Sequence, residues 1–101
     1  MFLGAYHFTG HPEPLLAGYR KLMAHYPPES LDLHVCVIHA TGMIVYDSCP
    51  SRELFDEFSQ GESFRAALAA AGLPEPSVEY LGKVYAAQIR QPVSTHVGTG
   101  R

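Results

Sequence analysis

The sequence predicts one α+β domain with the element order β-α-β-β-α-β. Two segments repeat apolar residues at three- and four-residue steps, as the buried face of a helix does. Four shorter segments are rich in β-branched and aromatic residues, which is typical of strands. The length of 101 residues suits a single domain.

The first half of this order is a strand followed by a helix. Residues 2–8 form an aromatic-rich strand that ends at Thr9-Gly10. Prolines at 12 and 14 are tolerated in a first helical turn, and Pro27-Pro28 ends the helix. The apolar face of the helix consists of Leu15, Leu16, Tyr19, Leu22, Met23 and Tyr26.

The second half begins with a hairpin. Residues 31–39 and 43–48 alternate around the turn at 40–42. Ser51 is a suitable N-cap for a helix over 51–58, which resumes over 64–71 and ends at Gly72. Residues 78–89 are the last strand, so we expect a domain over 1–89 and a C-terminal tail or arm over 90–101.

Right-handed crossovers turn this order into a ferredoxin-like, four-stranded antiparallel sheet with its helices on one face. Centring the hairpin on Thr41 places three pairs on one face: Ile38 with Ile44, Cys36 with Tyr46, and His34 with Ser48. The opposite face is aliphatic, so both faces are largely apolar, whereas an exposed sheet face is usually polar. We therefore expect a homodimer in which a second copy covers the bare face. The pattern leaves open which face meets the helices.

Composition excludes several classes of partner. The net charge is −3 and the seven Lys and Arg do not cluster, so no basic patch for nucleic acid is expected. No signal peptide and no membrane span is expected, which favours a cytoplasmic protein. Cys36 and Cys49 lie about three hairpin positions out of register, roughly 10 Å apart. This exceeds the reach of a disulfide, so free thiols are expected.

Residues 45–55, Phe58 and the run 63–66 resemble the dimeric α/β-barrel superfamily, most closely antibiotic-biosynthesis monooxygenases and small polyketide-cyclase-like proteins. The shared pattern is a strand ending in an acidic-x-aromatic pair, a serine that caps the next helix, and a Phe-Arg turn. The resemblance implies a dimeric α/β barrel with a pocket between helices and sheet in each subunit, and chemistry often without a metal or organic cofactor.

The chain also departs from that pattern. Cys49 stands where those monooxygenases usually carry Trp, and Phe58 where many have His. Residues 50–75 contain no His, so haem ligation through a helix His is not expected. Six histidines occur in the chain, but their spacing predicts no zinc site. We expect no metal and no cofactor, and a metal protein would require convergent histidines.

His34 and His7 are the candidate catalytic residues. An imidazole titrates near neutrality and suits proton abstraction from an acidic carbon or a phenol. The alternative for His34 is a partly buried side chain bonded to Ser48. If both imidazoles enter one cavity, they form an acid–base pair.

Four further residues are candidates for ligand binding. Tyr46 and Tyr19 can hydrogen-bond a ligand oxygen, although aromatic residues at such spacing also serve as core. Cys36 and Phe58 complete the predicted pocket wall.

The leading hypothesis is a cofactor-independent enzyme, monooxygenase- or cyclase-like, acting on a small aromatic or polyketide-like molecule in an apolar pocket. The alternative is a non-catalytic small-molecule-binding or dimer-forming protein whose His and Tyr side chains are satisfied core. A cavity of a few hundred Å³ with a free imidazole nitrogen favours the enzyme, and capped imidazoles favour the alternative. The sequence names neither substrate nor reaction.

Overall fold

The computed structural model describes residues 1–90 and 93. The elements are β1 (Phe2–Thr9), α1 (Pro12–His25), the short 3₁₀-helix η1 (Pro28–Ser30), β2 (His34–His39), β3 (Gly42–Cys49), α2 (Arg52–Ser59), α3 (Glu62–Ala71) and β4 (Ser77–Lys83). The strands form one antiparallel sheet in the order β2-β3-β1-β4. The α+β prediction is confirmed, and the arrangement is compatible with a ferredoxin-like fold. The dimeric barrel stays a prediction.

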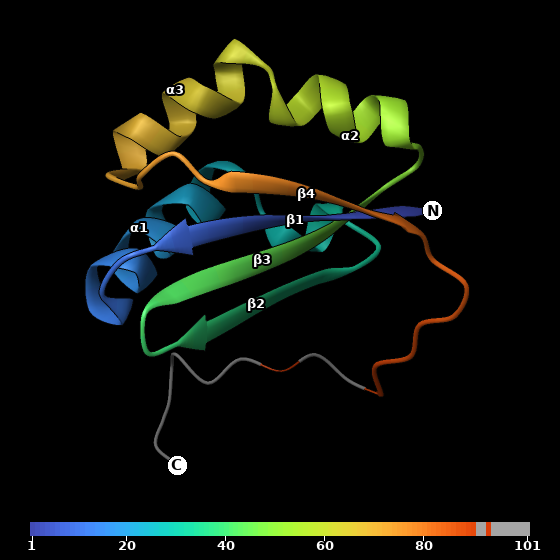
Figure 1. Cartoon of the computed structure of the whole chain (residues 1–101), viewed down its shortest axis with the longest axis horizontal. Coiled ribbons are helices and arrows are strands. Elements are labelled where there is room, and N and C mark those ends of the chain that lie inside the picture. Colours follow the sequence, from blue (N-terminus) through green and yellow to red (C-terminus); the bar gives the residue numbers. More distant parts are fainter. Residues whose placement is uncertain (91–92, 94–101) are drawn as a thin grey trace.

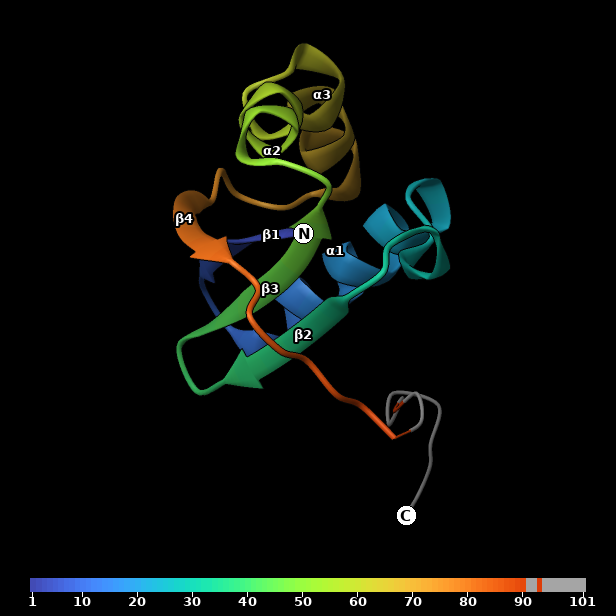
Figure 2. The same cartoon turned by 90° about the vertical axis from the view of Figure 1, so that its right-hand side faces the viewer.

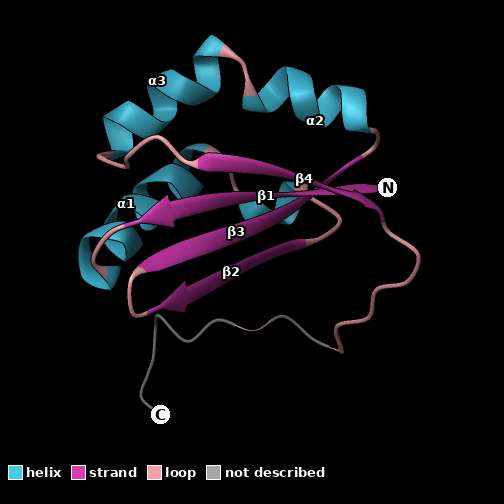
Figure 3. Ribbon diagram, viewed as in Figure 1, coloured by secondary structure: helices cyan, strands magenta, loops and turns pink. Residues whose placement is uncertain are grey.

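All three α-helices lie on one side of the sheet (Figures 1 and 3). The view from the side in Figure 2 separates α1 from α2 and α3. α1 packs against β2 and β3, α2 packs against β1, β3 and β4, and α3 packs against α1. The hydrophobic core fills the space between the layers, where Phe55 and Met43 are fully buried.

Local signals position the helix ends as predicted. The Oγ of Ser51 accepts a hydrogen bond from the Leu54 backbone N–H at 3.1 Å, which caps α2. Gly72 ends α3 with a φ of 78°, a left-handed conformation that favours glycine. Gly4 of β1 lies beneath α2, and a Cβ there would overlap the ring of Phe55. The missing side chain therefore lets α2 sit close to the sheet.

The predicted hairpin register is wrong by one residue. Three cross-strand pairs define the observed register: His34 with Asp47, Cys36 with Val45, and Ile38 with Met43. The connecting turn is only Ala40-Thr41, and Gly42 belongs to β3. A Cβ on Gly42 would overlap the carbonyl oxygen of Phe8, so this glycine serves the close approach of β1. As a result, His34 and Cys36 share a face with Asp47, while Tyr46 and Ser48 point to the other face.

Two predicted strands are too long. The last strand ends at Lys83 instead of residue 89, because its neighbour β1 begins at Phe2, which pairs with Lys83. Residues 31–33 precede β2, although Leu33 still exchanges hydrogen bonds with Ser48. The tail predicted over 90–101 lies outside the described residues except for 90 and 93.

We call the sheet surface that no α-helix covers the open face. It carries the outward-pointing residues of each strand, and two of its apolar side chains, Val37 and Leu81, are 40% and 45% exposed. Leu3, Ile44 and Tyr46 lie between them and are half-buried. In the part of the chain that is described, no helix has the length and apolar character needed to cross a membrane.

Candidate functional site

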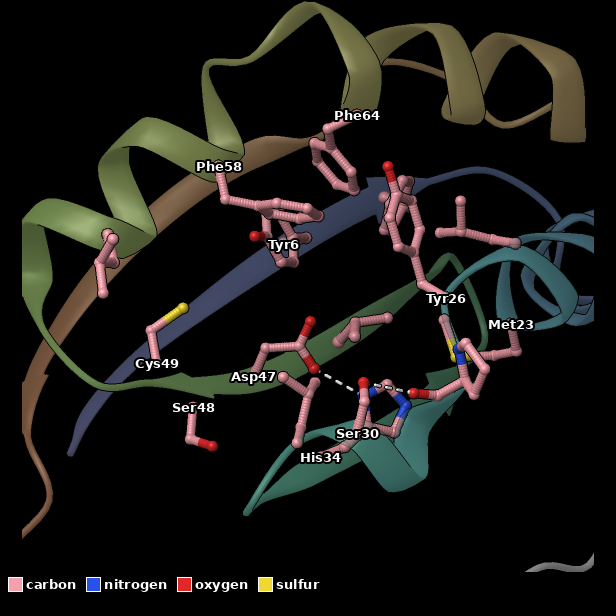
Figure 4. Close-up of a pocket in the computed structure, with 16 residues that line it drawn as sticks. Tyr6, Met23, Tyr26, Ser30, His34, Asp47, Ser48, Cys49, Phe58 and Phe64 are labelled. Carbon is pink, nitrogen blue, oxygen red and sulfur yellow. Dashed lines mark hydrogen bonds and ion pairs between the residues drawn. The ribbon is translucent and has the colours of Figure 1, made fainter.

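A pocket of about 330 Å³ lies between the helix layer and the sheet. Its wall is formed by β1, β2, β3, the end of α1 with the segment after it, α2, and the first turn of α3. Aromatic side chains form much of it: Tyr6, Phe8, Tyr26, Phe58 and Phe64. Figure 4 shows Phe58 and Phe64 reaching down from the helices and His34 and Asp47 facing them from the sheet. The pocket is therefore apolar with a localised polar floor.

The polar floor is an imidazole–carboxylate pair. His34 and Asp47 are cross-strand neighbours, and the Nδ1 of His34 lies 2.6 Å from the Oδ1 of Asp47. Their side chains are 10% and 19% exposed. A carboxylate accepts, so Nδ1–H is the donor, and Nε2 is left for a second partner.

Tyr19 of α1 forms a hydrogen bond with that second nitrogen. Its hydroxyl lies 2.6 Å from the Nε2 of His34, and the two rings stack with an interplanar angle of 16°. Burial, with a smaller contribution from Cys36, raises the pKa of Tyr19 to about 12. The hydroxyl therefore stays protonated at neutral pH while it is hydrogen-bonded to Nε2. Tyr19, His34 and Asp47 thus form a hydrogen-bonded chain directed toward the carboxylate.

This chain leaves Asp47, and not His34, with a free polar atom facing the pocket. Both ring nitrogens of His34 are bonded, whereas the second carboxylate oxygen of Asp47 has no hydrogen bond to any described residue. Figure 4 shows this oxygen pointing into the space below Phe58 and Tyr6. Asp47 was not among the residues predicted from the sequence, because the wrong register placed it on the face opposite His34. The correct pairing of His34 with Asp47 is the signal that finds it.

The other predicted catalytic residue lies elsewhere. His7 is on the open face, where its Nε2 lies 2.7 Å from the Oε1 of Glu79, and both side chains are well exposed. The structure therefore does not bring His7 and His34 into one cavity. Tyr46 is also on the open face, between Val35 and Ala5.

The remaining predicted residues lie in or beside the pocket. Phe58 lines it and packs on Phe64, with ring centroids 4.8 Å apart. Cys36 lies beside Tyr19, behind the pocket wall, and burial raises the pKa of its thiol to about 11. Cys36 and Cys49 are free thiols, which confirms the prediction of no disulfide between them.

Tyr6 and Cys49 line the pocket and were not predicted as site residues. Tyr6 is only 3% exposed, and burial together with the charge of Asp47 raises the pKa of its hydroxyl far above the usual value. The same two causes raise the pKa of the Cys49 thiol. Both groups are consequently protonated at neutral pH. Aromatic and sulfur side chains are common in cores, so the sequence alone did not separate these two from ordinary packing residues.

Within residues 1–90 and 93, no three His, Cys, Asp or Glu side chains come together as a metal site would require. No known protein family, curated protein or solved structure matches this chain.

Proposed function

We propose that the protein is a cofactor-independent enzyme that binds a small aromatic or polyketide-like molecule in the pocket and removes a proton from it. One observation carries this proposal: a carboxylate–imidazole pair joined at 2.6 Å faces an otherwise apolar cavity of about 330 Å³. A cavity of this size is suited to a small ligand. An apolar wall also strengthens the electrostatic effect of the one carboxylate within it.

In this proposal Asp47 is the catalytic base and His34 is a positioning residue. The Nδ1–H of His34 holds one carboxylate oxygen, so that the other faces the ligand. That oxygen takes a proton from a carbon next to a carbonyl group. The electron pair of the broken C–H bond moves to the carbonyl oxygen and forms an enolate. Cyclisation and cofactor-free oxygenation both begin with such an electron-rich carbon, which connects the site to monooxygenase- and cyclase-like chemistry.

A non-catalytic ligand-binding protein is the second candidate. A specific observation favours it: both nitrogens of His34 are bonded to Tyr19 and Asp47, as expected of a satisfied core histidine. In that case the chain of three residues stabilises the pocket, and the ligand leaves chemically unchanged.

Hydrogen–deuterium exchange on a bound ketone separates the two candidates. 2-Tetralone is an uncharged bicyclic ketone with an acidic C–H group, and its exchange in D₂O can be followed by proton NMR. Catalysis predicts faster exchange with the wild-type protein and loss of the acceleration in Asp47→Asn, by on the order of 100-fold for a lost general base. His7→Ala is the matched control and should exchange at the wild-type rate. Saturable binding without exchange would establish the non-catalytic candidate, and no binding would reject both.

We also propose that the open face pairs with a second copy of the chain to form a homodimer. The exposed apolar side chains Val37 and Leu81 support this, because burying such a surface is favourable. Sedimentation should show a dimer for the wild type and a monomer for Val37→Lys. Ala69→Lys, on the exposed side of α3, is the control and should remain dimeric.

The two free thiols support the proposal of a reducing, cytoplasmic setting.

A further inference from the structure

The hydroxyl group of Tyr6 is a buried donor without a hydrogen-bond partner in the part of the chain that the structure describes. Tyr6 is 3% exposed, and its hydroxyl makes no hydrogen bond to any described residue. Its ring is held between Phe55 and Phe64, with centroid distances of 5.5 and 5.0 Å. Leaving a buried hydroxyl unpaired is costly, so such a group calls for an explanation. The ring is fixed and the residue lines the pocket, so the cavity has room for a ligand atom to accept this hydrogen bond in place of water.

The neighbours of this hydroxyl define a polar end of the pocket. Figure 4 shows the sulfur of Cys49 pointing toward Tyr6, and the free oxygen of Asp47 pointing into the same space. The negative charge of Asp47 contributes to the raised pKa of both the Tyr6 hydroxyl and the Cys49 thiol. The pocket therefore combines two donors with one strong acceptor.

The charge of the wall restricts the ligand further. Among the described residues that line the pocket there is no Lys or Arg, and the one imidazole is already bonded to Asp47. A ligand carboxylate or phosphate would be buried beside Asp47 without a cation to balance it. Burying such an unpaired like charge is strongly unfavourable.

We propose that the pocket selects an uncharged ring molecule with two oxygen functions. One oxygen accepts a hydrogen bond from the Tyr6 hydroxyl. The other oxygen, or the acidic C–H group next to it, faces Asp47. This inference rests on the proposed function, since it assumes that the pocket holds a ligand. It makes Tyr6 a specificity-determining residue that distinguishes a ketone from the same ring without the carbonyl group.

Three probes of similar size test the inference by calorimetry. 5-Hydroxy-1-tetralone carries both oxygen functions, 5,6,7,8-tetrahydro-1-naphthol lacks the carbonyl, and 1-naphthoate is anionic. The hydroxytetralone should bind wild-type protein about 3- to 10-fold more tightly than the naphthol, the range of one net hydrogen bond. Tyr6→Phe should abolish that difference without weakening the naphthol, whereas Tyr46→Phe, on the open face, should preserve it. 1-Naphthoate should bind more weakly than either neutral probe. Asp47→Asn should reduce this difference in affinity, because it removes the negative charge that repels the anion.

Each failure has a distinct meaning. If neither neutral probe binds the wild type, the proposed function fails together with the inference. If both bind and Tyr6→Phe keeps the preference for the ketone, the role of Tyr6 is overturned while the ligand pocket stands. If 1-naphthoate binds as well as the neutral probes, the selection against charge is overturned.

Thermal unfolding without any probe gives an independent check. Tyr6→Phe removes an unpaired hydroxyl, so its melting temperature should equal or exceed that of the wild type. Tyr19→Phe is the matched control, because it removes a hydroxyl that is bonded to His34 and should lower the melting temperature. An equal loss in both variants would show that the Tyr6 hydroxyl is already satisfied within the protein and would overturn the inference.

Discussion

His34 and Asp47 face each other across β2 and β3, and their side chains join at 2.6 Å beneath the helix layer. A carboxylate in an apolar cavity needs a partner to compensate for its lost hydration. His34 supplies this partner from the neighbouring strand, and Tyr19 fixes the imidazole from α1. Elements distant in the sequence therefore converge on one charged group.

Replacing Asp47 with Asn should destabilise the fold at neutral pH. The amide oxygen still accepts from Nδ1–H, but a hydrogen bond to a charged group contributes more than a neutral one, so we expect a loss of about 1–2 kcal/mol in the free energy of unfolding. Urea titration followed by circular dichroism measures it. Asp32→Asn, at an exposed position before β2, should be neutral. Equal stability of Asp47→Asn and wild type would mean that desolvation cancels the benefit of the pair.

Alkaline pH should destabilise the protein partly through Tyr19. The pKa of this hydroxyl is about 12 in the folded protein against 10.0 ordinarily, so the folded state holds the proton more tightly. The stabilisation is present below pH 10 and is lost as the pH rises toward 12. Urea titrations across this range should show a shallower decline for Tyr19→Phe than for the wild type. Tyr85→Phe removes a fully exposed hydroxyl and should decline like the wild type.

Both cysteines should react slowly with thiol reagents at neutral pH. The thiolate is the reactive form, and raising the pKa of Cys36 from 9.0 to about 11 lowers its thiolate fraction on the order of 100-fold. Single-cysteine variants, Cys36→Ser and Cys49→Ser, allow each thiol to be followed with a chromogenic disulfide. A ligand such as 2-tetralone should slow Cys49, which lines the pocket, and leave Cys36 unchanged. Protection of Cys36 alone would place the ligand elsewhere.

Gly4 should not tolerate a side chain while Phe55 lies above it. Gly4→Ala puts a Cβ into the Phe55 ring, and overpacking of this kind costs about 1–3 kcal/mol. Phe55→Leu creates space but loses core contacts. The double variant Gly4→Ala/Phe55→Leu should therefore lose less unfolding free energy than the two single variants lose in total, as measured by urea titration. Strict additivity would contradict the contact.

The sequence predicted the helices and strands better than the register in which the strands pair. Helix starts and ends depend on local chemistry, such as the Ser51 cap and the left-handed Gly72, so they could be predicted. The hairpin register could not, because both faces of β2 and β3 are apolar and either alignment buries hydrophobic side chains. The close packing of Gly42 against β1 is a contact between distant residues that the hairpin pattern does not reveal.

The same limit shaped the prediction of the site. His34, Tyr19 and Phe58 were nominated from residue type and position, and the structure places all three in or against the pocket. Finding Asp47 depended on the hairpin register, and the separation of His7 from His34 results from the pairing of β1, β2 and β3, which puts the two imidazoles on opposite faces of the sheet. Chemistry-bearing residues can be recognised in a sequence, but which of them meet is decided by strand pairing.

The pocket wall draws only on positions from Tyr6 to Phe64 among the described residues. β4 completes the sheet yet lends no side chain to the cavity. The side chains that line the cavity thus come from the first two thirds of the chain, while the last strand closes the sheet. Substitutions meant to change the shape of this cavity would accordingly be placed between β1 and the first turn of α3, and β4 could stay as it is.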